Sequence, residues 1–166
     1  MNSNLKKIKA EVYDKCFLYI TDFLIEPEGK EYDACQFKLN GLYILCRNAK
    51  ITPKKAGQFV TFWKRTGCGL IAPFNETDKI DFYIVNVRTE NRFGQFVFPK
   101  TELIRQGIIS TSQREGKRAF RVYPPWDTAK SKQAVQTQKW QSDFFYELNN
   151  SPDLNRVKKL YKATKD

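Results

Sequence analysis

The chain has 166 residues, of which 41% are hydrophobic and 14% aromatic, and its formal net charge is +11. This length fits one domain and this composition supplies an apolar core, which excludes a disordered chain. No apolar run is long enough to cross a membrane, and the first residues begin an amphipathic segment instead of an apolar secretory leader. We therefore expect a cytoplasmic protein.

Missing and isolated residue types exclude several kinds of chemistry. The chain has no histidine, so histidine-activated nucleophiles, histidine general bases and histidine metal ligands are impossible. Its cysteines, Cys16, Cys35, Cys46 and Cys68, form no Cys-x-x-Cys pair, which argues against zinc sites and disulfide scaffolds. We expect reduced thiols, mostly buried, and predict neither a bound metal nor a cofactor.

The positive charge is concentrated in two parts of the chain. Residues 31–70 carry seven cationic side chains against two acidic ones, and residues 101–166 carry thirteen against seven. The remaining segments are balanced. Such blocks are typical of two elements that jointly form one basic face, although a merely solubilising surface charge is the alternative.

The first elements are predicted to be a helix and a hairpin. Apolar residues recur at helical spacing over residues 4–24, which predicts an amphipathic helix. Two apolar runs, 32–39 and 42–47, flank Asn40 and Gly41, and Asn-Gly between such runs indicates a β-hairpin.

The middle of the chain is predicted to be mainly strands. Thr52 followed by Pro53 indicates the start of a turn or short helix. Residues 58–64 are rich in aromatic and β-branched side chains, which favours a strand. Stronger strand patterns cover residues 81–88 and 93–99.

The last elements are predicted to be a short helix, a strand and a long helix. The helix covers residues 101–106 and ends at a glycine, and residues 119–123 form a strand. Residues 126–148 are predicted to form a long helix. We expect an α+β fold in which the N-terminal helix and this long helix flank a central mixed or antiparallel sheet. One domain over residues 1–148 precedes a polar C-terminal extension, 149–166, expected to be a frayed turn or tail.

Several segments together resemble one family of bacterial proteins, the MepB-like family. The resemblance covers roughly residues 26–146 and is carried by Ala49-Lys50-Ile51-Thr52-Pro53, Gly57-Gln58-Phe59-Val60, Trp63-Lys64-Arg65, Phe93-Gly94-Gln95-Phe96-Val97-Phe98-Pro99-Lys100, Arg121-Val122-Tyr123-Pro124-Pro125-Trp126-Asp127 and Trp140-Gln141. The family is similar to a protein encoded beside a multidrug efflux pump and its MarR-type repressor. The resemblance implies no settled activity, so function must be argued from the residues.

Both basic blocks contain candidate phosphate ligands. In the first block, lysines on a turn that follows a strand suit phosphate oxygens. In the second block, arginines offer paired contacts to phosphates, and Trp126 could stack on a base or equally form a packed corner. The candidate nucleic-acid ligands are Arg47, Lys50, Lys54, Lys55, Lys64, Arg65, Arg114, Lys117, Arg118, Arg121, Lys130 and Lys132.

The order of elements also resembles the PD-(D/E)XK nucleases, in which an aspartate and a Glu-x-Lys or Gln-x-Lys motif bind a metal for phosphodiester cleavage. Asp33 and Lys50 could take the aspartate and lysine places. Position 48 is asparagine where the motif has glutamate or glutamine, and one aspartate with an asparagine is a poor ligand set for Mg²⁺. If the fold is nuclease-like, we expect a degenerate scaffold that binds without cutting, with Mg²⁺ only if the protein is an active nuclease.

The leading hypothesis is a protein that binds nucleic acid, with DNA favoured over RNA. The first alternative is an enzyme or pocket protein acting on a nucleotide or another anionic small molecule, because the same cations would serve it. A protein-interaction module that docks to an acidic partner is the second alternative.

Overall fold

The computed structural model describes residues 1–149 and 151–162. A mixed six-stranded sheet forms the centre of the molecule, in the order β1-β2-β3-β8-β9-β11. Its strands are β1 (Ile20–Ile25), β2 (Cys35–Leu39), β3 (Leu42–Asn48), β8 (Phe82–Arg88), β9 (Phe93–Pro99) and β11 (Phe145–Glu147). β3 and β8 are parallel, and the other neighbours are antiparallel. The predicted α+β class with a central mixed sheet is confirmed.

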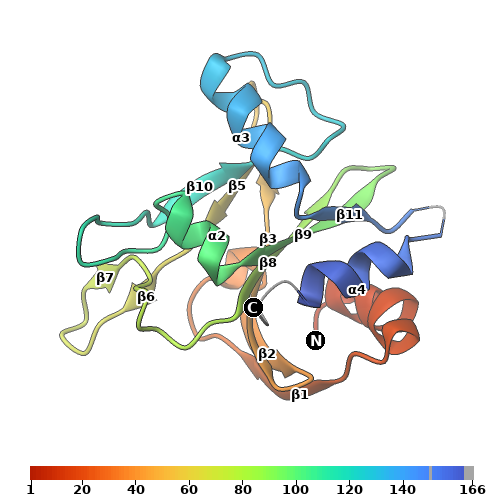
Figure 1. The fold of residues 1–166 in the computed structure, drawn as a ribbon, viewed down its shortest axis with the longest axis horizontal. Helices are drawn as coiled ribbons and strands as arrows, with labels where there is room; N and C mark the ends of the chain where they lie inside the picture. Colours follow the sequence, from red (N-terminus) through yellow and green to blue (C-terminus); the bar gives the residue numbers. More distant parts are fainter. Residues whose placement is uncertain (150, 163–166) are drawn as a thin grey trace.

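Each face of this sheet carries its own hydrophobic core, because alternate side chains of a strand point to opposite faces. One face packs against two helical segments that lie beside each other in Figure 1. They are the N-terminal segment, formed by α1 (Ser3–Ile8), η1 (Lys9–Tyr13) and η2 (Asp14–Cys16), and the C-terminal helix α4 (Leu154–Lys162).

A smaller sheet and two helices pack near the other face. The small sheet has the order β10-β5-β4, and its strands are β4 (Lys50–Ile51), β5 (Gln58–Thr61) and β10 (Ala119–Val122). Beside it lie α2 (Lys100–Arg105) and α3 (Lys132–Ser142), and α3 runs next to β10 in Figure 1. A short 3-10 turn, η3 (Lys30–Tyr32), precedes β2, and β6 (Lys64–Arg65) pairs with β7 (Ile71–Ala72).

Several local predictions are confirmed. The Asn40-Gly41 turn joins β2 to β3, with φ of 49° and 84° at its two residues. Both angles lie in the left-handed region that Asn and Gly tolerate best. All four cysteines are free, and only Cys68 is exposed. No helix among the described residues is long and apolar enough to cross a membrane.

The predicted helix over residues 4–24 is wrong beyond Cys16. Phe17 adopts a left-handed conformation, with φ of 57°, and ends the helical segment. The following residues form β1 and pair with β2 in the register Ile20↔Leu39. Pairing with a neighbouring strand overrides the helical spacing of the apolar residues here.

The predicted helix over residues 126–148 is also wrong at both ends. The side chain of Ser131 accepts a hydrogen bond from the backbone N–H of Ala134 and starts the helix there. After Ser142 the chain becomes β11, which pairs with β9. The expected strand over residues 58–64 is likewise divided into β5 and β6.

Residues 154–162, which we expected in a frayed turn or tail, form the helix α4. Its side chains Val157, Leu160 and Tyr161 are buried in the core against the N-terminal helical segment. Their spacing of three and four residues places them on one helical face, and burial of that face holds the helix in place.

Candidate nucleic-acid interface

The small sheet brings the two basic blocks of the sequence together. β4 and β5 are joined by a turn over residues 52–57, and β10 runs antiparallel to β5. Arg121 on β10 donates from Nε to the Ala56 carbonyl at 3.1 Å, and from Nη2 to the Thr52 hydroxyl at 2.6 Å and the Gly57 carbonyl at 3.1 Å. The guanidinium therefore ties the turn of the first block to a strand of the second.

Two close contacts support this junction. A Cβ atom on Gly57 would lie 2.8 Å from the Tyr123 ring, and Gly57 has a φ of +78°. Only glycine satisfies both conditions comfortably. The amide of buried Gln141 on α3 accepts from the Tyr123 backbone N–H and donates to the Arg121 carbonyl, so it anchors the end of β10.

A cleft lies at this junction and consists of two neighbouring pockets that share Arg121 and Tyr123. The first pocket, of about 530 Å³, lies between the turn and the start of α3. The second, of about 400 Å³, lies between β10 and α3. We call the two together the basic cleft, since the cationic side chains that line it are Lys54, Lys55, Lys117, Arg121 and Lys130.

The charge of the basic cleft is unbalanced. Among the described residues, its lining contains no aspartate or glutamate. The described residues also show no ion pair to any of the five cations of the basic cleft. One of these cations, Arg121, instead donates hydrogen bonds to a hydroxyl and two carbonyls. The Asp127 carboxylate nearby accepts from the Gly57 backbone N–H at 3.0 Å. Because the clustered cations outnumber it, they produce a local positive potential that attracts anions.

Five other predicted ligands are paired with carboxylates. Their pairs are Arg47–Glu26 at 2.6 Å, Lys50–Glu31 at 2.9 Å, Lys64–Asp78 at 2.7 Å, Arg65–Glu28 at 2.5 Å and Arg118–Glu115 at 3.3 Å. Arg47 is buried, and burial also raises the pKa of the Glu26 carboxyl although the Arg47 charge opposes that shift. Arg114 is exposed over Gly107, and Lys132 is exposed in the first turn of α3.

Asp33 and Lys50 lie near one end of the central sheet but have different partners. Asp33 accepts a hydrogen bond from the Asn48 side-chain amide at 2.8 Å, whereas Lys50 pairs with Glu31 and lies over the Tyr32 ring. Neither residue lines the basic cleft. Within residues 1–149 and 151–162, no three His, Cys, Asp or Glu side chains are grouped closely enough to hold a metal ion.

The Asp33–Asn48 bond is the end of a buried chain of amides that the sequence analysis missed. Asn86 donates to Asn48 at 2.9 Å, and Gln95 donates to Asn86 at 2.8 Å. These residues are direct cross-strand neighbours on β3, β8 and β9. The Gln95 oxygen in turn accepts from the Tyr146 hydroxyl at 2.7 Å. We call this arrangement the amide ladder.

The signal for the amide ladder is present in the sequence. Asn86 and Gln95 interrupt apolar strands at inward-facing positions, and a buried polar side chain normally has a hydrogen-bond partner. The hydroxyls of Tyr13 and Tyr161 also reach the Gln95 oxygen, and burial raises the pKa of both tyrosines. The hydroxyls therefore remain protonated donors.

The Trp126 side chain packs against other side chains of the chain. Its ring meets Phe145 edge-on at 5.8 Å between centroids, and the Arg92 guanidinium lies 4.9 Å from its centroid. This placement is the packed corner that we gave as the alternative to base stacking.

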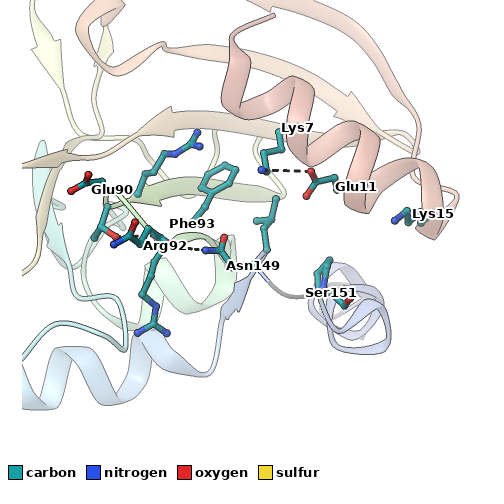
Figure 2. Close-up of a pocket in the computed structure, with 13 residues that line it drawn as sticks. Lys7, Glu11, Lys15, Glu90, Arg92, Phe93, Asn149 and Ser151 are labelled. Carbon is teal, nitrogen blue, oxygen red and sulfur yellow. Dashed lines mark hydrogen bonds and ion pairs between the residues drawn. The ribbon is translucent and has the colours of Figure 1, made fainter.

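Other pockets carry mixed charge. A pocket of about 440 Å³ lies between the N-terminal helical segment and the β8–β9 hairpin. Figure 2 shows Lys7 paired with Glu11 in its lining. Its lining holds the cations Lys7, Lys15, Arg88 and Arg92 and the acids Glu11 and Glu90. A further pocket, of about 330 Å³, is lined by both members of the Arg47–Glu26 and Arg65–Glu28 pairs. Neither pocket favours an anion as strongly as the basic cleft does.

The fold and the cleft define an α+β protein that is built on a mixed sheet and carries a basic cleft beside a small second sheet. The chain belongs to the MepB-like family, whose model matches residues 26–147. It is 34% identical to a protein solved as the crystal structure of MepB, with a TM-score of 0.78, over 90% of this chain and 99% of that one. A bacterial homing endonuclease, I-Ssp6803I, is 13% identical, with a TM-score of 0.47 over 83% of this chain and 85% of the endonuclease. No curated protein matches the chain.

Proposed function

We propose that this protein binds nucleic acid, and DNA in preference to RNA, through the basic cleft. The observation that carries the proposal is the set of five cations without a carboxylate in the lining of the cleft. Phosphate contacts supply most of the affinity of a protein for a nucleic-acid backbone, and lysine and arginine are the residues that make them. The paired cations elsewhere are weaker candidates, because the neighbouring carboxylate repels a phosphate.

Arg121 supports the proposal through its geometry. Its Nε and Nη2 atoms hold the turn, while Nη1 has no partner among the described residues and can contact a phosphate oxygen. The positive end of the α3 dipole adds to the potential, because Lys130 and Ser131 line the cleft where that helix begins.

We propose binding without cleavage. The Asn48 amide donates its N–H to Asp33, and its oxygen accepts from Asn86, so an N–H group and not an oxygen faces the Asp33 carboxylate. A hard divalent cation requires several oxygen ligands at one point. This arrangement supports the proposal of binding on a degenerate nuclease-like scaffold.

We also propose that the protein acts in the cytoplasm. Cys35 and Cys46 are direct partners across β2 and β3, yet both are free thiols. Interaction with the Cys35 thiol, and then burial, raises the pKa of Cys46, so little thiolate forms. Free, unreactive thiols suit a reducing compartment.

The sharpest test is a charge-neutralising pair of substitutions with a matched control. Lys54→Gln/Lys55→Gln removes two cleft charges, and Lys6→Gln/Lys159→Gln removes two exposed charges from the helices on the opposite face. Anisotropy of labelled DNA should show binding that weakens with salt. For a single strand, the slope of the logarithm of the binding constant against the logarithm of the salt concentration should be smaller in magnitude by about 1.4 in the cleft variant. Equal binding by the two variants would place the interface elsewhere, and binding indifferent to salt would refute the proposal.

A nucleotide or related anionic small molecule is the second candidate. The two pockets have volumes of about 400 and 530 Å³, in the size range of small-molecule sites. A mononucleotide that raises the melting temperature of the protein, in the absence of DNA binding, would favour this candidate.

A further inference from the structure

The two edges of the central sheet differ in how the chain covers them. At β11, Arg156 of α4 donates from Nε to the Phe145 carbonyl at 2.7 Å and from Nη2 to the Ser142 carbonyl at 3.0 Å. At β1, the opposite edge, no side chain among the described residues bonds to the backbone of residues 20–25. Unpaired backbone groups at the edge of a sheet are a template for another strand. β1 is therefore the open edge of this sheet.

The pairing of β1 with β2 fixes the direction of its free backbone groups. The backbone N–H of Glu26 donates to the Ala34 carbonyl at 2.9 Å. In an antiparallel ladder the N–H and C=O of the preceding residue, Ile25, then point away from β2. A bulge between Thr21 and Leu24 interrupts the strand, so only a short segment can pair regularly with the part that follows the bulge.

Large apolar side chains are exposed along this edge. Of the nine large hydrophobic side chains that are exposed among the described residues, four lie in and just before β1, namely Phe17, Tyr19, Leu24 and Ile25. Successive side chains of a strand point to opposite faces of the sheet, so a strand added outside β1 would cover both Leu24 and Ile25. Such a concentration of exposed apolar surface is typical of an interaction site.

A small pocket lies on the face of the sheet beside Leu24. It has a volume of about 220 Å³, and its mainly apolar lining includes Phe37 and Leu45. Lys79 also lines it, with its ammonium 4.5 Å from the centroid of the Tyr43 ring and no ion pair among the described residues. Where a peptide adds to a sheet edge, main-chain bonds give affinity and pockets for alternate side chains give specificity. This pocket suits an apolar side chain that has a carboxylate close by in the same segment.

Charge decides between a second copy of this chain and a different partner. The other charged residues of the pocket, Lys38 and Asp22, pair with each other at 2.9 Å, so Lys79 determines its net charge. A second copy would bring another net charge of +11 and another bulged edge. Both features disfavour pairing of two such edges, whereas an acidic segment is attracted to the chain.

We propose that β1 is a docking edge for a short extended segment of an acidic partner protein, which adds a strand to the six-stranded sheet. An apolar side chain of the segment enters the pocket beside Leu24, and a carboxylate meets Lys79. In Figure 1, β1 lies at the lower end of the molecule and α3, which borders the basic cleft, at the upper end. The partner and a nucleic acid can therefore bind at the same time, and the docking edge does not depend on the proposed function.

The test measures the anisotropy of three fluorescent peptides of equal length with the unmodified full chain. All alternate valine and threonine. The first carries two glutamates, the second carries two lysines in their place, and the third is the glutamate peptide with N-methyl groups on its central backbone amides. The glutamate peptide should bind about tenfold more tightly than the lysine peptide, and the N-methylated peptide should not bind, because it cannot form the edge hydrogen bonds. No binding of the glutamate peptide at about 1 mM, or equal binding of either control, would overturn the proposal.

Three variants then locate the binding site of the glutamate peptide. Ile25→Pro removes an N–H that points away from β2, a change that edge strands tolerate, and should abolish binding. Lys79→Gln, at an exposed position, should weaken it about threefold, and does not depend on how the proline affects folding. Lys54→Gln/Lys55→Gln should leave it unchanged. Loss of peptide binding in that last variant would assign the peptide to the basic cleft and overturn the proposal. A dimer in sedimentation that Ile25→Pro dissociates would assign the edge to a second copy and overturn it as well.

Discussion

Arg121 and Thr52 are 69 residues apart in the sequence, yet Nη2 of Arg121 donates to the Thr52 hydroxyl over 2.6 Å. This bond joins the two basic blocks and aligns the turn that bears Lys54 and Lys55 with β10. Arg121 is therefore a positioning residue for the turn as well as a candidate phosphate ligand.

Arg121→Lys should weaken DNA binding by about tenfold, although it keeps the charge, because a lysine cannot reproduce the forked contacts of a guanidinium. Hydrogen exchange should at the same time become faster at the amides of residues 52–57. Arg118→Lys, which changes an exposed arginine paired with Glu115, is the matched control. Unchanged exchange in the Arg121 variant would show that the guanidinium does not hold the turn.

Gly57→Ala should lower the free energy of unfolding by about 2 kcal/mol, because it combines a left-handed φ with a clash against Tyr123. Gly67→Ala is the control, since a Cβ there meets nothing within 4 Å. Urea denaturation measures both. Equal stability of the two variants would mean that the Gly57–Tyr123 contact relaxes without cost.

Gln95→Leu should destabilise the protein by about 3 kcal/mol, because it leaves the Asn86 oxygen and a tyrosine hydroxyl buried without partners. Tyr146→Phe alone should lower the free energy of unfolding by less than Gln95→Leu does. The double variant should cost less than the sum of the two, since residues in one hydrogen-bond network are not additive. Strict additivity in urea denaturation would show that the amide ladder does not act as a unit.

Arg47→Met should lower the free energy of unfolding by about 3–5 kcal/mol, because it leaves the Glu26 carboxylate partly buried without its partner. Adding Glu26→Leu should recover most of that loss, since an apolar pair can replace a buried ion pair. We expect the double variant to bind DNA as tightly as the unmodified protein. A loss of DNA binding in a stably folded double variant would make Arg47 a ligand after all.

Local patterns were reliable where the chain contains a strong local signal. The Asn40-Gly41 hairpin is such a case, because the turn conformation depends on those two residues. The helix prediction continued past Cys16 because apolar residues recurred at helical spacing, and only pairing with β2 makes that stretch a strand. Residues 154–162 were misjudged for a related reason, since a short amphipathic helix is stable only where its apolar face finds a core.

The sequence by itself determined the absence of histidine chemistry, the family, the α+β class and the presence of two basic blocks, because these depend on composition and local pattern. Only the tertiary structure decided which cations lie together. Arg47, Lys64 and Arg65 face carboxylates that are distant in the sequence, whereas Lys54 and Lys130 meet across the basic cleft. The physical reason is that electrostatic potential depends on distances in space, and those distances follow from strand pairing and not from separation along the chain.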